Sequence, residues 1–67
     1  MQRWEVRDQL SGNGWFEYNT AKAAWKAAYR VFRANERVFG PDASVTVTCI
    51  YSEQPVQRLS YTLTTRL

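Results

Sequence analysis

Five cationic side chains recur at helical spacing in residues 20–39 of this chain, separated by four, four, three and four positions. At about 100° per helical residue they fall within a sector of roughly 80° that contains no acid. Lys and Arg donate charge-assisted hydrogen bonds to carboxylates and phosphates, so a row of this kind is suited to binding an anionic partner. The five residues are Lys22, Lys26, Arg30, Arg33 and Arg37.

The same row costs the helix stability. Like charges four residues apart destabilise a helix by roughly 0.2–0.5 kcal/mol per pair, and Lys22 also lies in the first turn, at the positive end of the helix dipole. Residues 20–39 contain five of the nine Lys and Arg residues but only one acid, Glu36, so this segment carries +4 while the rest of the chain carries −1. A pattern that the fold opposes indicates a binding surface.

Two aromatic residues extend this candidate surface. Tyr29 lies beside the cationic row, and an amphipathic ring next to Arg is typical of contact surfaces. Trp15 is directed outward by strand alternation beside the turn at residues 12–14, and an exposed Trp is a frequent binding hot spot. The competing interpretation is an ordinary solvated face, since long charged side chains also cover apolar surface with their stems. The exclusion of acids and the three Arg residues in the second half of the row favour binding.

The residues that support most catalysis and zinc binding are either missing or not grouped in this sequence. The sequence has no His, and its one Cys, Cys49, falls on the inner face of a predicted strand, where a thiol behaves as a small hydrophobic group. Its six acids are scattered singly, so no two are placed as an acid and base pair. Without His or a second Cys, an ordinary zinc site is excluded. We therefore predict no catalytic residue, no metal site and no cofactor, and a protein that is not an enzyme.

Length and composition predict one small domain over residues 1–67. Hydrophobic residues make up 45% of the chain and aromatic residues 15%, which supports a packed core and argues against disorder. No apolar run approaches the ~20 residues of a membrane span, and residues 1–7 are alternating and charged, unlike a signal peptide. One cysteine cannot form an internal disulfide, so a cytoplasmic location is expected. The net charge of +3 fits an anionic partner.

Strand alternation is visible in four segments of the sequence, residues 2–8, 15–18, 44–52 and 56–65. The first two are close enough to form a hairpin, with its turn at residues 12–14. Apolar side chains take one face, which we expect to be buried, and a flat Thr-rich face is left for water or a partner. The expected inner face consists of Trp4, Val6, Phe16, Tyr18, Val45, Val47, Cys49, Tyr51, Leu59, Tyr61 and Leu63. The expected outer face consists of Thr46, Thr48, Thr62, Thr64, Arg3, Arg7, Arg58 and one exposed apolar residue, Ile50.

The clearest pattern in the chain is an amphipathic helix over residues 20–39. Asn19 or Thr20 is expected as its N-cap, and Gly40-Pro41 as its stop. Its apolar stripe lies opposite the cationic row, as packing on a sheet requires. The predicted fold class is therefore α+β, a four-stranded antiparallel sheet in ββαββ order with one amphipathic helix packed on one face. The stripe consists of Ala21, Ala24, Trp25, Ala28, Phe32 and Phe39, with Asn35 as its polar exception.

In its element order, its size and its lack of catalytic motifs, the chain resembles small inhibitor proteins encoded by phages and mobile elements. Several anti-CRISPR proteins and phage inhibitors of host RNA polymerase have a similar arrangement. The resemblance covers the whole chain as architecture, and it carries over no residue role. It implies a non-enzymatic inhibitor that docks on a larger protein or nucleoprotein complex of the host, through the basic helix face, the outer sheet face or both.

Direct nucleic-acid binding is the alternative function. The cationic row spans about 15 residues, or ~22 Å, and could follow a phosphate backbone. Five phosphate contacts would give a slope of about −4 to −5 in log K against log salt. The predicted strands lack the aromatic pattern of an RNA-recognition sheet and no helix-turn-helix is present, so such binding would be weakly specific. A third interpretation is a homodimer formed through an edge strand or the Thr-rich face, because so small a domain gains stability from oligomerising.

Overall fold

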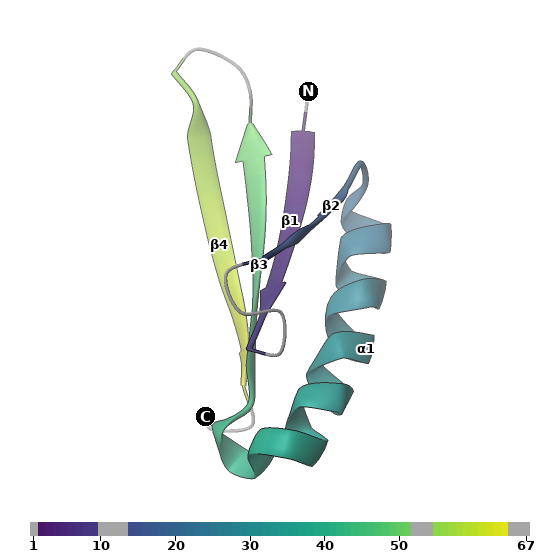
Figure 1. The fold of residues 1–67 in the computed structure, drawn as a ribbon. Helices are drawn as coiled ribbons and strands as arrows, with labels where there is room; N and C mark the ends of the chain where they lie inside the picture. Colours follow the sequence, from purple (N-terminus) through teal and green to yellow (C-terminus); the bar gives the residue numbers. More distant parts are fainter. Residues whose placement is uncertain (1, 10–13, 52–54, 65–67) are drawn as a thin grey trace.

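Four antiparallel strands form one sheet, and one α-helix packs on one of its faces, in the residues that the structure describes (Figure 1). The structure is a computed structural model, and it describes residues 2–9, 14–51 and 55–64. The predicted α+β class and the ββαββ order are confirmed. Along the chain the elements are β1 (Gln2–Asp8), β2 (Phe16–Tyr18), α1 (Ala21–Phe39), the 3-10 helix η1 (Gly40–Asp42), β3 (Ser44–Tyr51) and β4 (Gln57–Thr64).

The strand order of the sheet is β2-β1-β3-β4, so β1 and β3 are central and β2 and β4 are the edges. β1 is antiparallel to both of its neighbours, and Trp4 lies opposite Tyr18 of β2. The predicted hairpin of the first two strands is therefore formed, although Gly12 and Asn13 of its predicted turn lie outside the described residues. β2 is shorter than predicted, because Trp15 precedes the paired segment.

The core lies between α1 and the two central strands. Ala24 and Ala28 are fully buried, and their small side chains bring the helix close to Val6, Val45 and Val47 of the sheet. Burying one such valine contributes about 1.5–3 kcal/mol, so these contacts determine how α1 is rotated on the sheet. Trp4 and the predicted buried Cys49 complete this cluster, and Tyr18, Trp25, Val31, Phe32, Tyr51 and Leu63 pack against it.

Both ends of α1 are capped as the sequence predicts. Thr20, one of the two expected N-caps, accepts a hydrogen bond from the Ala23 backbone N–H at 3.2 Å through its Oγ1. At the other end Gly40 has a φ of 58°, which side chains of L-residues disfavour, and its N–H donates to the Glu36 carbonyl. Pro41 follows in η1, where its ring prevents the α-helix from continuing.

Asn35 lies on the buried side of α1 and has no exposed surface. Its Nδ2 donates to the Val31 carbonyl at 2.7 Å, and its Oδ1 accepts from the Gln9 backbone N–H at 3.2 Å. The Gln9 side chain in turn donates to the Asp42 carbonyl and accepts from the Ser44 N–H, both at 3.0 Å. This polar exception to the apolar stripe therefore anchors the second half of α1 to the segments that follow β1 and precede β3.

Ile50, expected to be exposed on the outer face, is only 4% exposed. The register offers a physical reason, because Ile50 lies opposite Arg3 of β1 and Arg58 of β4, and the long stems of Arg side chains can cover a neighbouring apolar residue. On the same face Glu5 is also buried, and its carboxylate oxygens lie 3.8 Å from guanidinium nitrogens of Arg3 and Arg7. The outer face is thus partly covered by its own charged side chains.

The apolar inner face is covered less completely than the sequence predicts. Phe16 of β2 and Leu59 and Tyr61 of β4 belong to this face but are 55%, 49% and 47% exposed. A helix is about 10 Å wide, whereas four strands at ~4.8 Å spacing span roughly 20 Å. α1 lies mainly on β1 and β3, and β4 is the strand farthest from it (Figure 1). Ala21 and Phe39, at the two ends of the predicted apolar stripe, are exposed as well.

Replacing Asn35 with Ala should lower the free energy of unfolding by about 1–3 kcal/mol, because the Gln9 N–H would lose its partner. Chemical denaturation followed by tryptophan fluorescence measures this change. Asn19→Ala is the matched control, since it makes the same chemical change at an exposed position before the helix. Equal effects of the two substitutions would contradict the anchoring role of Asn35.

Candidate functional site

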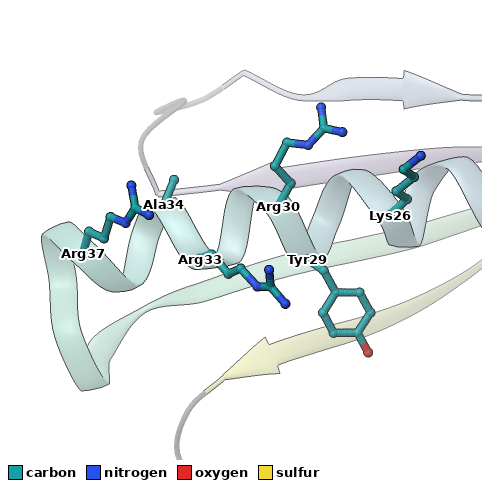
Figure 2. A pocket seen from close by; sticks show the side chains of 6 residues that line it. All are labelled: Lys26, Tyr29, Arg30, Arg33, Ala34 and Arg37. Atoms are coloured by element: carbon teal, nitrogen blue, oxygen red, sulfur yellow. The ribbon is translucent and has the colours of Figure 1, made fainter.

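The five cations of α1 lie on one exposed side of the helix and form its cationic face. The buried stripe through Ala24, Ala28 and Asn35 sets the rotation of the helix, so the opposite side points away from the sheet. Figure 2 shows four of the five cations around the helix, together with Tyr29. The members of the cationic face are Lys22, Lys26, Arg30, Arg33 and Arg37, and all are exposed.

An open hollow of about 680 Å³ lies on the cationic face. Ala34 contributes a short side chain to it, while Arg30 and Arg33 extend to different sides, so two guanidinium forks flank the space (Figure 2). Ala34 was not a predicted site residue, although its place one turn after Arg30 would have identified it. The hollow is lined by Lys26, Tyr29, Arg30, Arg33, Ala34 and Arg37, whereas Lys22 is not among its lining residues.

None of these five cations forms an ion pair with an acid in the described part of the chain. The ion pairs seen there belong to the outer sheet face, where Arg3 and Arg7 each lie 3.8 Å from Glu5 and Arg3 also lies 3.9 Å from Glu17. Glu36, the acid of α1, pairs with none of them. The positive charge of the cationic face is therefore not neutralised by these residues, and it attracts anions over a Debye length of ~8 Å.

Tyr29 is positioned by aromatic contacts that run from α1 to β4. Its ring centroid lies 6.1 Å from that of Trp25, and the Trp25 centroid lies 5.7 Å from that of Tyr61. Because Trp25 packs against the core, Tyr29 keeps a defined position while 54% of it remains exposed. The hollow thus has one amphipathic ring on the side to which Arg33 extends (Figure 2).

Trp15 lies apart from the cationic face. The guanidinium carbon of Arg7 lies 4.9 Å from the centroid of the Trp15 ring, and Trp15 Nε1 donates to Glu17 Oε1 at 3.4 Å. Arg7 and Glu17 belong to the sheet face that α1 does not cover. The structure therefore brings six of the seven predicted contact residues together on α1 and places the seventh on the outer sheet face.

A second hollow, of about 380 Å³, lies on the outer sheet face. The hydroxyl oxygens of Thr48 and Ser60 are hydrogen-bonded at 3.0 Å within it. Its charges are mixed, because the Glu5 carboxylate lies among cations, so it does not present the uniform positive charge of the cationic face. The lining residues are Glu5, Arg7, Thr46, Thr48, Arg58 and Ser60.

Two further findings bear on the kind of site. The described residues contain no group of three or more His, Cys, Asp or Glu side chains that could hold a metal ion. Within the same residues, no helix has the length and apolar character needed to cross a membrane.

Comparison with protein-family models, with curated proteins and with solved structures found no match. What the cationic face binds is therefore inferred from the chemistry of its own residues.

If the cationic face opposes the fold, Arg30→Glu should raise the free energy of unfolding by a few tenths of a kcal/mol, roughly 0.2–0.5 per relieved pair. The substitution replaces repulsion from Lys26 and Arg33 by attraction, and the gain should disappear at high salt. Denaturation at low and at high salt measures both effects.

Arg58→Glu is the matched control, since it makes the same charge change on the outer face, where Glu5 lines the same hollow. It should give no gain in stability. A clear loss of stability in Arg30→Glu would show that this cation supports the fold, and would contradict the account of the cationic face.

Proposed function

We propose that this chain is a non-enzymatic, cytoplasmic binding module whose cationic face docks on an acidic surface of a larger protein or nucleoprotein complex. The observation that supports this function is the set of five exposed cations without an acidic partner in the described residues, held on one side of one helix. A face that only contacts water does not require cations to be kept apart from acids. Repulsion between the cations also makes this arrangement unfavourable for the helix by itself.

The composition of the hollow favours a protein as the partner. Tyr29 and Ala34 add apolar surface between the cations, and Tyr with Arg is the combination enriched at the centre of protein interfaces. The guanidinium forks of Arg30 and Arg33 suit two-point contacts with carboxylates from two sides. An acidic loop or helix of the partner, carrying at least two carboxylates, is therefore the expected ligand.

The charge of the remaining surface argues against nucleic acid as the main partner. Outside residues 20–39 the chain carries −1, and the outer sheet face includes Glu5 and Glu17 in ion pairs with Arg3. A row of cations along one helix can follow a phosphate backbone, but here the rest of the chain adds no net positive charge that would extend that path. Phosphate binding by the cationic face remains the alternative, and the experiment below has to distinguish it from protein binding.

Inhibition of the bound complex is the expected consequence of docking. A domain of 7.8 kDa adds no activity of its own in this proposal, but it occupies the acidic surface and excludes the natural ligand of that surface. The architectural resemblance to small phage and mobile-element inhibitors, including anti-CRISPR proteins, agrees with this mode of action.

An affinity pull-down from host lysate, with and without nuclease, tests the proposed function. Wild type should retain a protein partner after nuclease treatment, and the double variant Arg30→Glu/Arg33→Glu should lose it. Loss of a binding hot spot costs about 2 kcal/mol or more, so if Arg30 and Arg33 include one, a loss of at least 30-fold in affinity for the partner is expected.

Arg58→Glu serves as the control, because it changes charge on the outer sheet face and should leave the partner bound. Circular dichroism establishes that each variant is folded. Retention of the partner by the double variant would exclude the cationic face. A wild-type signal that vanishes with nuclease, together with binding of purified DNA or RNA that the double variant loses, would show that the face binds phosphates, and would replace this proposal by nucleic-acid binding.

A further inference from the structure

β4 is a long edge strand with little protection. It spans Gln57–Thr64, and in the described part of the chain no strand lies on its outer side. Proteins protect exposed edges by shortening them or by placing Pro and charged residues in them. β4 has no Pro and one charged residue, Arg58, whereas the opposite edge strand, β2, has only three residues. β4 is therefore the edge at which another strand can add.

The inner face of β4 presents apolar surface beside this edge. Leu59 and Tyr61 are about half exposed, because α1 lies mainly on β1 and β3. The Trp25 ring contacts Tyr61, and Leu59 is still 49% exposed. An added strand therefore has to match a row of backbone groups and an apolar row of side chains at the same time.

We propose that the strand added to β4 is β4 of a second copy of this chain. Two copies related by a twofold axis perpendicular to the sheet pair their edges antiparallel and place both helices on the same face. The result is one eight-stranded sheet, in which neither copy leaves its long edge open. This inference does not depend on the proposed function, because the cationic face takes no part in the contact.

The sequence of β4 is self-complementary about Tyr61. With the twofold axis at that residue, the two Tyr61 rings meet, and Leu59 lies opposite Leu63 of the second copy. Arg58 lies opposite Thr64 of the second copy, so no like charges face each other. All three apolar residues of the inner row, Leu59, Tyr61 and Leu63, then meet apolar residues across the new strand pair.

Charge also favours this arrangement over other contacts between two copies. Contact through the helices would place two segments of +4 against each other. Pairing through β4 separates the helix axes by four strand spacings, or ~19 Å, which is well beyond the ~8 Å Debye length at physiological salt. In the dimer both cationic faces remain exposed on the same side, and the net charge of +3 is doubled.

Light scattering on the wild-type protein over a wide concentration range is the first test. It should give twice the 7.8 kDa of the monomer. Hydrogen exchange on the same protein should show that edge amides of β4 become protected as concentration rises, while amides of β2 do not. A mass of 7.8 kDa at every concentration, including the millimolar range, would overturn the proposal, and edge pairing with a different protein would then be the remaining use of β4.

Cross-linking tests the register. Tyr61→Cys places two thiols at the twofold axis, where directly opposite residues have Cβ atoms about 4.5–5.5 Å apart, so oxidation should give a covalent dimer. Tyr29→Cys is the matched control, with similar exposure on α1, and should not cross-link. Cys49 is buried and does not compete. Light scattering could give the mass of a dimer while Tyr29→Cys cross-links and Tyr61→Cys does not. That result would also overturn pairing through β4.

Discussion

The close packing of α1 on the central strands is the constraint on which the other features of this molecule depend. Ala24 and Ala28 have no exposed surface, and their small side chains let the helix approach Val6, Val45 and Val47. Their burial sets the rotation of α1, and the caps at its two ends set its length. Because the cationic face lies opposite the buried stripe of the helix, the same rotation directs the cationic face away from the sheet.

Two exposed surfaces follow from this packing. The first is the cationic face, which is separated from the acids of the outer sheet face by the thickness of the sheet and helix. The second is the apolar inner side of β4, which exists because one helix cannot cover four strands. Trp25 connects them, since its ring contacts Tyr29 on one side and Tyr61 on the other. A change that moved α1 on the sheet would therefore alter both surfaces together.

Local patterns in the sequence were enough to predict the four strands, the α-helix and its caps, and the six residues grouped on it, because helical and strand periodicity depend on near neighbours. Features that depend on strand register or on distant contacts were not predictable. Ile50 is buried and lies opposite arginines of two other strands, and Asn35 is anchored through Gln9, 26 positions away. Tyr61 was assigned to the correct face, but its exposure depends on where α1 lies across the sheet.

The proposed function requires that the cationic face binds carboxylates and is not simply solvated. The most direct measurement is a nuclear magnetic resonance titration of the isotope-labelled domain with polyglutamate, with single-stranded DNA of equal charge as the comparison. If carboxylates are the ligand, polyglutamate should shift the amide signals from Lys26 to Arg37, including Tyr29, and the guanidinium signals of the arginines among them, at a lower concentration than DNA does. Shifts confined to the outer sheet face, no shifts at physiological salt, or tighter binding of DNA would contradict it.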